Sequence, residues 1–325
     1  MSTPLFSLIV PVYNVAEFIE ECLRQCFDQP GIEEGEYEVI VVDDGSKDES
    51  ISLARPIIEQ HSNACIIHQE NKGLSEARNA GLRAASGKYV WFIDSDDYIT
   101  TNCLAQLKER ILEADAPDIV SFSSRVFEVE TVDIEEIHPP QADSMTGVQL
   151  LDTDRYVIPV HHYLYKHEFL LSHQLTFYPR IYHEDEEFGP RALYFATKVI
   201  FDQRLFYNYR MRSGSITHTY TMKHPTDLET IVQRLLDFTQ EGHRSGGLDR
   251  TIARLFLNIL TLYRKLNRTQ EPIQLLGKCK KNPRLMQILH KHTDKRFRFL
   301  GKMIQNFPAP IAWQVYKAYH QLTRH

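Results

Sequence analysis

Short apolar runs rich in β-branched residues alternate with helix-like segments over the first hundred positions. Four such runs have the pattern of strands: residues 6–10, 38–42, 65–67 and 89–93. Helical spacing covers residues 16–26 and 73–85, with Gly87 as the expected end of the second helix. Ser46 and Glu49 have the form of a capping box that starts a further helix. Because the strand-like runs are apolar at successive positions, the pattern predicts a doubly wound α/β fold, with a mostly parallel sheet buried between helices.

The pattern changes in the last third of the chain. Beyond Thr221 apolar residues recur at helical spacing, and we expect helices over residues 226–241 and 248–266. Three further short helices should follow, separated by proline-containing breaks. The predicted organisation is therefore an α/β domain over residues 1–220 and a helical, basic C-terminal region over residues 221–325.

Charge divides the chain in a similar way. Residues 264–325 hold 14 Lys and Arg against two acidic residues, a net +12, so the rest carries −18 within a total of −6. Basic and aromatic residues are mixed between Lys295 and Lys302, which is typical of helices that lie on an anionic membrane surface. The alternative is a helical cap whose basic face is solvated or pairs with the acidic body. Nucleic acid is not an expected partner, because no recognised binding motif accompanies the charge.

Composition bounds the class of protein. A chain of 325 residues that is 42% hydrophobic and 25% charged has the make-up of a globular protein. No stretch approaches the roughly 20 apolar residues that cross a bilayer. The five cysteines are dispersed and include no Cys-x-x-Cys pair. We therefore expect a cytoplasmic protein with reduced thiols, peripheral on the inner face of the plasma membrane if its basic helices bind lipid.

Polar residues follow three of the expected strands, at the edge where parallel sheets bind ligands. The segments that hold them are Pro11-Val12-Tyr13-Asn14, then Asp43-Asp44-Gly45-Ser46, then Asp94-Ser95-Asp96-Asp97. No Gly-x-Gly-x-x-Gly or Gly-x-x-x-x-Gly-Lys motif is present, which argues against a Rossmann dinucleotide site and a P-loop. Asp94 and Asp96 project to the same side of an extended segment, so both can reach one Mg²⁺ or Mn²⁺ that holds a diphosphate. The alternative is a solvated turn with Asp97 as a helix N-cap.

Five blocks of sequence, in this order, resemble the family 2 glycosyltransferases of bacterial polysaccharide synthesis. They are SLIVPVYN at 7–14, VVDDGSKDES at 41–50, NKGLSEARNAGLRAASGKYVWFIDSDD at 71–97, HEDEEF at 183–188 and YRMRSGSIT at 209–217. The resemblance covers residues 5–220. It implies a GT-A fold, inverting chemistry and a divalent metal, Mn²⁺ or Mg²⁺, bound by an Asp-x-Asp motif.

The same resemblance implies a donor site. Its residues are Pro11, Val12, Tyr13, Asp43, Asp44, Lys72, Arg78, Asp94 and Ser95. The first three would enclose the base and ribose, and either Asp43 or Asp44 would accept a hydrogen bond from the base, which suits uracil. Asp94 and Asp96 correspond to the metal-binding pair. Arg210, Arg212 and Ser215 are the candidates for contact with the diphosphate.

Inverting transfer also requires a base for the acceptor hydroxyl. Asp185 is the expected base and Glu184 the alternative, because the two match the Glu-Asp pair of the family. Without the resemblance, Glu184 to Glu187 could be no more than an acidic first turn favoured by the helix dipole. We expect no metal role for histidines, because none shows a partner at a recognised ligand spacing: His161, His162, His173, His183, His290 and His292.

Together these features predict an inverting glycosyltransferase that uses a UDP-sugar. The expected acceptor is a hydroxyl of a growing glycan or of a polyprenyl-linked oligosaccharide. Two alternatives remain at this stage: a sugar nucleotidylyltransferase, which shares the α/β layout, and a non-catalytic protein that binds nucleotide-sugars. Short motifs do not encode the sugar, the linkage or the oligomeric state.

Overall fold

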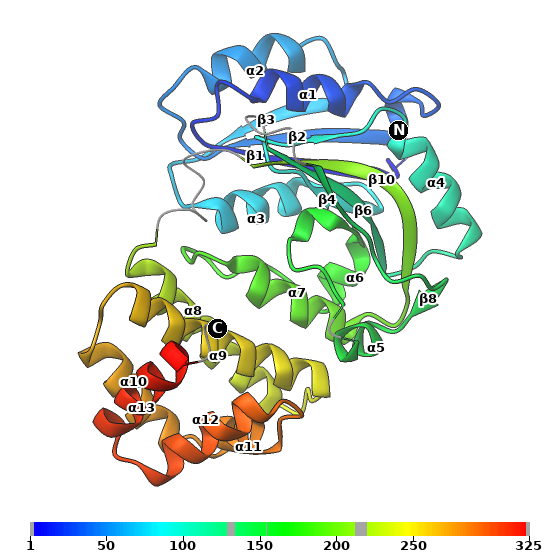
Figure 1. Ribbon diagram of the computed structural model, residues 1–325. Helices are drawn as coiled ribbons and strands as arrows, with labels where there is room; N and C mark the ends of the chain where they lie inside the picture. The colour runs from blue at the N-terminus through cyan, green and yellow to red at the C-terminus, as the bar shows by residue number, and fades with distance from the viewer. Residues whose placement is uncertain (1–2, 129–133, 154, 212–219, 323–325) are drawn as a thin grey trace. The chain divides into compact units, whose positions relative to one another are not determined.

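The computed structural model describes residues 3–128, 134–153, 155–211 and 220–322. The chain forms two compact units, residues 1–215 and residues 216–325 (Figure 1). The first unit contains strands and helices, and the described part of the second contains helices.

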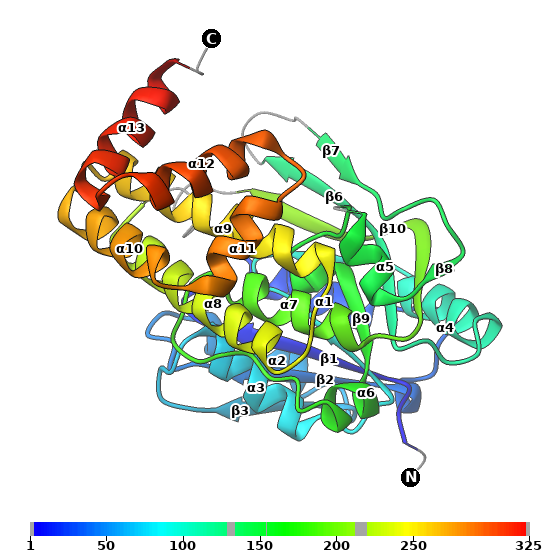
Figure 2. The ribbon, with the colours of Figure 1, turned by 90° about the horizontal axis from the view of Figure 1, so that it is seen from below.

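A ten-stranded mixed sheet forms the centre of the first unit, with the main order β3-β2-β1-β4-β9-β6-β10-β5 (Figure 2). Neighbours among β1 to β4 are parallel, as are β6 and β10, whereas β9 is antiparallel to both β4 and β6. The expected mostly parallel sheet is confirmed, and β9 is an antiparallel insertion that the pattern did not predict. The strands are β1 (Phe6–Val12), β2 (Tyr37–Asp43), β3 (Ala64–His68), β4 (Tyr89–Phe92), β5 (Tyr98–Ile99), β6 (Ile119–Glu128), β7 (Ile134–Ile137), β8 (Ser144–Met145), β9 (Tyr163–Lys166) and β10 (Val199–Met211).

Helices cover both faces of this sheet (Figure 1). One face of β1 packs against α1, α2 and α4 in the largest core cluster, and the other faces α3. At Gly81 of α3, an added Cβ would lie 2.3 Å from Ile9 Cγ2, so the glycine allows a close approach of helix to strand. The helices of this unit are α1 (Ile19–Phe27), α2 (Ser50–Ile58), α3 (Leu74–Ala84), α4 (Cys103–Glu113), α5 (Gly147–Asp152), α6 (His167–Ser172) and α7 (Glu184–Phe195), with short 3₁₀ turns η1 (Glu34–Glu36) and η2 (Val160–His162).

Two local predictions were wrong, and the alternative considered for Asp97 is excluded. Helix α2 begins at Ser50 without a capping box, because its N-cap is Glu49 and Ser46 lies before the helix, where its hydroxyl donates to Val12 O. Gly87 does not cap α3; its N–H donates to Ser7 Oγ, and an added Cβ would collide with the backbone of Phe6. Asp97 is not a helix N-cap, because Tyr98 and Ile99 form strand β5.

The second unit, where described, has one more helix than expected. Its helices are α8 (Lys223–Gln240), α9 (Gly246–Lys265), α10 (Gln270–Lys280), α11 (Pro283–Lys291), α12 (Lys295–Asn306) and α13 (Ala309–Leu322). Four helices rather than three follow α9. Ser245 and Asn282 cap α9 and α11 by accepting hydrogen bonds from Leu248 N–H and Leu285 N–H. No helix within the described residues is long and apolar enough to cross a membrane.

Candidate active site

The carboxyl ends of β1, β2 and β4 lie side by side at one edge of the sheet. Asp44 N–H donates to Val12 O across β2 and β1, and Ile93 N–H donates to Ile9 O across β4 and β1, at 2.9 Å each. The three predicted polar segments therefore meet at one edge, as their places after parallel strands required.

Arg78 of α3 joins residues from two of the predicted motifs. Its Nη2 donates to Asp94 Oδ1 at 2.7 Å, and its Nη1 donates to Glu184 Oε1 at 2.6 Å and to Asp185 Oδ1 at 3.2 Å. The Arg78 side chain is 2% exposed and also lies over the ring of Phe177. The structure thus brings the Asp-x-Asp segment and the Glu-Asp pair to one guanidinium.

The neighbours of Asp94 and Asp185 shift the pKa values of these two residues in opposite directions. Burial alone would raise the pKa of Asp94, but the charge of Arg78 and the bond from His161 hold it well below the ordinary value. Burial and the adjacent charge of Glu184 raise the pKa of Asp185 well above the ordinary value, against the effect of Arg78. Asp94 therefore keeps its charge to lower pH than an exposed aspartate, while Asp185 binds a proton more readily than an exposed aspartate.

The Glu-Asp pair begins helix α7. His183 precedes it with φ +63°, a left-handed conformation that turns the chain into the helix. The Asp185 side chain is 20% exposed, and Val160 N–H lies 3.4 Å from its Oδ2. Glu187, in the same turn, is fully buried in an ion pair with Arg191. The acidic turn therefore has at least two roles, since Glu187 is structural while Glu184 and Asp185 face Arg78.

Arg210 holds the aspartate loop from the other side. Its Nε donates to Asp96 O at 3.0 Å, and its N–H donates to Asp97 Oδ1 at 2.8 Å. Its guanidinium pairs with Glu21 and lies over three aromatic rings, those of Phe18, Tyr98 and Phe127. The sequence predicted a contact of Arg210 with the diphosphate; in the structure the partners of Arg210 are Asp96, Asp97 and Glu21. Arg212 and Ser215 lie outside the described residues.

Asp97 is buried behind this loop. Tyr207 Oη donates to Asp97 Oδ2 at 2.7 Å and accepts a hydrogen bond from Asp94 N–H at 3.1 Å. Burial and the charges of Asp96 and Asp94 raise the pKa of Asp97 well above the ordinary value.

His161, from η2, is a site residue that the sequence analysis missed. Its Nδ1 lies 3.3 Å from Asp94 Oδ2. Among the described residues, the group of three or more possible metal ligands is Asp94, Asp97 and His161, whose ligand atoms lie within 4.8 Å of one another. The absence of a sequence spacing was misleading here, because η2 comes beside Asp94 only through the antiparallel pairing of β9 with β4.

Asp43 and Asp44 each hold a loop. Asp44 accepts from Gln69 Nε2 and from the N–H groups of Lys72 and Gly73, at 2.7–2.9 Å. Asp43 accepts from Ser46 N–H and lies 2.9 Å from His68 Nδ1. Tyr13 is 45% exposed and Lys72 is also exposed, whereas Pro11 and Val12 are buried. Tyr13 and Lys72 are therefore the predicted donor residues most open to a ligand.

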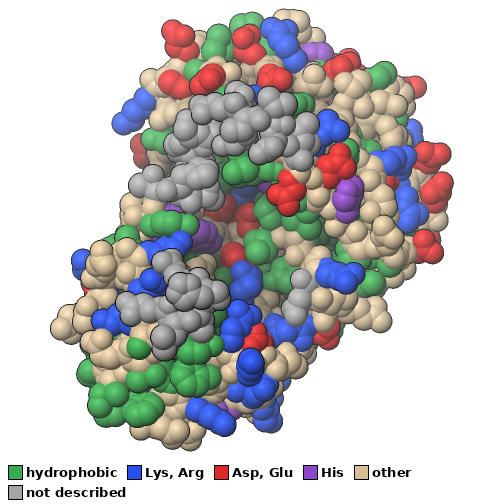
Figure 3. Space-filling view, viewed as in Figure 1, with side chains coloured by type: hydrophobic (Ala, Val, Ile, Leu, Met, Phe, Trp, Pro, Cys, Tyr) green, Lys and Arg blue, Asp and Glu red, His purple; other side chains and the backbone are tan. Residues whose placement is uncertain are grey.

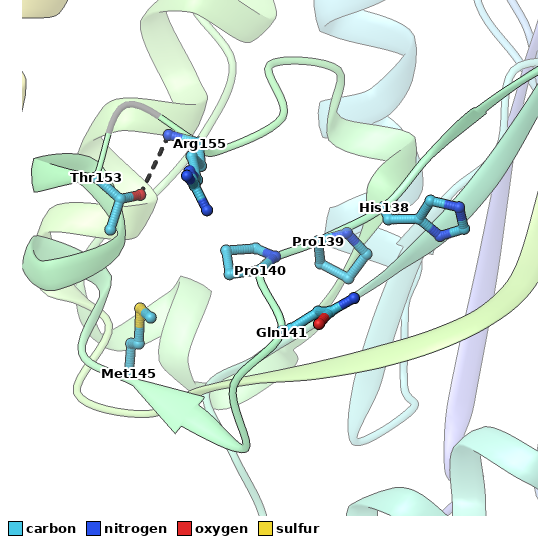
Figure 4. Close-up of a pocket in the computed structure, with 7 residues that line it drawn as sticks. All are labelled: His138, Pro139, Pro140, Gln141, Met145, Thr153 and Arg155. Atoms are coloured by element: carbon cyan, nitrogen blue, oxygen red, sulfur yellow. Dashed lines mark hydrogen bonds between the residues drawn. The ribbon is translucent and has the colours of Figure 1, made fainter.

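A separate surface pocket does not coincide with this site (Figure 4). It is lined by His138, Pro139, Pro140, Gln141, Met145, Thr153 and Arg155. None of these is a predicted site residue, and none of these described lining residues carries a carboxylate.

Residues 7–168 match the family described as glycosyl transferase family 2. The chain belongs to this family. It is 28% identical over 280 residues to the glycosyltransferase GlyG of Streptococcus pneumoniae, covering 80% of this chain and 88% of that protein. The chain is thus a glycosyltransferase, and the alternatives of a nucleotidylyltransferase and a non-catalytic binding protein are set aside.

Solved structures share the fold. S. aureus TarS 1–349 in complex with UDP-GlcNAc has a TM-score of 0.68 at 21% identity, covering 98% of this chain and 92% of that chain. The mannosyltransferase PcManGT from Pyrobaculum calidifontis, in complex with GDP-Man and Mn²⁺, has a TM-score of 0.53 at 18% identity, covering 98% and 88%. The GT-A fold predicted from the sequence is confirmed.

Proposed function

We propose that this glycosyltransferase inverts the anomeric centre of a UDP-sugar with Asp185 as general base. The observation that carries the proposal is the Arg78 arrangement, in which one buried cation lies between Asp94 and the Glu184-Asp185 pair. A donor held at Asp94 and an acceptor deprotonated at Asp185 would then lie close to each other, because both carboxylates contact the same guanidinium. Glycosyltransferases of the same fold have been solved with UDP-GlcNAc and with GDP-Man, which supports a nucleotide-sugar donor.

The donor site is proposed at the ends of β1 and β2. Tyr13 offers an exposed ring for the base, with Pro11 and Val12 forming the buried floor beneath it. Asp43 or Asp44 would accept the N3–H of uracil, since each carboxylate oxygen can accept more than one hydrogen bond. Lys72 is exposed and carries a positive charge that suits a phosphate.

In the chemical step, the acceptor hydroxyl attacks the anomeric carbon as its proton passes to Asp185 Oδ2 or Oδ1. The bond from that carbon to the diphosphate oxygen breaks, and UDP leaves with the electron pair. The raised pKa of Asp185 makes its carboxylate a stronger base than an exposed aspartate. Glu184 then holds Arg78 in place through the shorter of the two contacts.

Asp94 and Asp96 are the proposed ligands of Mn²⁺ or Mg²⁺, with Ser95 between them in the loop. Carboxylate oxygens are the donors that these hard cations prefer, and the low pKa of Asp94 keeps its oxygens free of protons. The buried Asp97, close to Asp94, adds to the set of possible ligands. Such a cation would stabilise the charge that develops on the diphosphate.

Calorimetric titration with UDP, with and without Mn²⁺, tests this assignment. Wild type should bind UDP in a metal-dependent way, and Asp94→Asn and Asp96→Asn should each lose the metal dependence. Exposed Glu70→Gln is the matched control, since Glu70 lies at the same edge but outside the proposed ligand set. Failure of the wild type to bind UDP under any metal condition would refute the uridine assignment.

We also infer that the acceptor is a growing glycan or a polyprenyl-linked oligosaccharide at an anionic membrane surface. Exposed apolar side chains occur among basic residues of the second unit: Phe299, Phe307 and Ile311 are 41%, 41% and 49% exposed. Lys295, Phe299 and Lys302 share the exposed face of α12, opposite its buried residues. Figure 3 shows Lys, Arg and hydrophobic side chains together on the surface of this unit. Positive charge around apolar side chains is suited to anionic lipid.

A further inference from the structure

His161 is a buried side chain with a fixed orientation and no part in the chemistry described above. It is 3% exposed, and its ring lies parallel to that of Tyr207, with centroids 4.2 Å apart and planes 5° apart. Trp91 Nε1 donates to His161 O at 2.8 Å. Strands β4 and β10 therefore fix both the backbone and the ring of His161.

This ring points one nitrogen at the carboxylate of Asp94. Asp94 Oδ1 accepts from Arg78, and Asp94 Oδ2 lies 3.3 Å from His161 Nδ1. An ionised carboxylate only accepts hydrogen bonds, so the proton between these two atoms belongs to Nδ1. The other nitrogen, Nε2, has no hydrogen-bond partner among the described residues. His161 is therefore a donor to Asp94 through Nδ1.

We propose that His161 is a positioning residue that orients Asp94 for the divalent cation. The inference rests on the proposed function, because it takes Asp94 as a ligand. Arg78 and His161 occupy one lone pair on each carboxylate oxygen of Asp94 and leave the others for the cation.

Hydrogen-bond partners of ligating side chains have measurable effects on metal affinity. Their loss typically weakens binding by about 10–100-fold, because the ligand then samples orientations that do not bind. The effect expected of His161 is of this kind. It acts through Asp94, so removing it should change the dissociation constant of the cation before any sugar is transferred.

The test is Mn²⁺ binding to the full chain, followed by electron paramagnetic resonance, for the wild type and two variants. His161→Asn places an amide N–H close to the position of Nδ1, whereas His161→Phe keeps a ring against Tyr207 without a donor. We expect His161→Phe to weaken Mn²⁺ binding by about 10–100-fold and His161→Asn to remain near the wild type. His162→Phe is the control, because His162 is equally buried but its Nε2 lies 3.3 Å from Ser124 Oγ rather than near Asp94.

Pulsed electron paramagnetic resonance of protein labelled with ¹⁵N-histidine distinguishes a positioning role of His161 from direct binding of the metal. If His161 only positions Asp94, the wild type should show no strong coupling between Mn²⁺ and the nitrogen of His161. A strong coupling that is present in the wild type and absent in His161→Asn would make His161 a ligand and overturn the proposal. Wild-type affinity in His161→Phe would overturn it as well. Absence of Mn²⁺ binding in the wild type would instead refute the metal site itself, and the inference with it.

Discussion

Arg78 Nη1 lies 2.6 Å from Oε1 of Glu184, a residue 106 positions later in the chain. The contact joins α3, which follows the first strands of the sheet, to the first turn of α7. Since Arg78 Nη2 also donates to Asp94, the guanidinium separates the donor-side carboxylate from the acid pair. The negative charge of three carboxylates can then be confined to one small volume.

Arg78→Gln should destabilise the protein strongly. Removing one partner of a buried ion pair leaves uncompensated charge, which costs about 3–5 kcal/mol. Three buried or half-buried carboxylates lose their cation here, so we expect a decrease of this size in the free energy of unfolding, measured with urea at pH 7. Arg83→Gln, on the same helix but 65% exposed, should change little.

The Arg78→Gln defect should also depend on pH. Arg78 lowers the pKa of both Asp94 and Asp185, so without the arginine these two acids become harder to ionise and burial raises their folded-state pKa values above the unfolded ones. Such groups favour folding below the unfolded pKa and oppose it as pH rises through the folded pKa. The deficit relative to wild type should therefore shrink as pH falls toward 4. A deficit that stays constant with pH would show that lost packing against Phe177, rather than charge, is responsible.

Asp185→Asn and Glu184→Gln should separate the two candidate bases. Loss of a general base lowers kcat by about 10²–10⁴-fold, and we expect this for Asp185→Asn. Glu184→Gln should keep measurable activity. Near-complete loss in Glu184→Gln with activity retained in Asp185→Asn would reverse the assignment.

The pH profile of the Glu184→Gln enzyme gives an independent check. In the wild type, the rise of kcat/KM with pH should follow ionisation of Asp185, whose pKa is raised first by burial and then by the charge of Glu184. Removing that charge lowers the pKa of Asp185, so the acidic limb should move to lower pH. If the acidic limb of the kcat/KM profile stayed at the same pH, the group that ionises there would not be Asp185.

Much of the first unit could be predicted because its signals are local. The apolar runs ending at Val10, Val42 and Ile93 lie in parallel strands, and the polar residues after them meet at one edge. Strand β9 could not be predicted in the same way, since Tyr163–Lys166 is short and its antiparallel partners are far away in the chain. Gly87 was assigned to a helix end for a similar reason, because its close approach to Phe6 is a tertiary contact.

The candidate site shows the same limit. Motif blocks pointed to Asp94 and to the Glu184-Asp185 pair, and the structure places these together. The blocks did not show that Arg78 bridges them, because a sequence carries no sign of which acids an arginine will meet after folding. The sequence analysis expected no metal role for His161 because no other ligand follows it at a recognised spacing. Such spacings detect only partners on the same element.

Gly81→Ala should destabilise the first unit through one contact. Its Cβ would lie 2.3 Å from Ile9 Cγ2, and overpacking of this kind costs about 1–3 kcal/mol. Ile9→Ala should relieve part of this cost, so the double variant should be more stable than the sum of the single effects predicts. Gly277→Ala in α10 is the control, since nothing lies within 4 Å of its added Cβ, and a gain of about 0.5–1 kcal/mol is expected there. Additive effects at Gly81 and Ile9 would contradict the contact.

The last prediction concerns the exposed apolar residues Phe299 of α12, Ile311 of α13, and Phe307 between the two helices. If the second unit binds anionic bilayers, the triple variant Phe299→Ser, Phe307→Ser, Ile311→Ser should lower binding to phosphatidylglycerol vesicles by well over about tenfold, because each fully buried apolar side chain contributes roughly 1.5–3 kcal/mol. Co-sedimentation measures this, with phosphatidylcholine vesicles and high salt as conditions in which binding should fall. Leu112→Ser and Leu171→Ser, at exposed sites in the first unit, are the matched controls. No binding by either protein would favour a solvated helical cap. Equal binding by the triple variant and wild type would contradict insertion of Phe299, Phe307 and Ile311, and would mean that charge alone holds the unit on the bilayer.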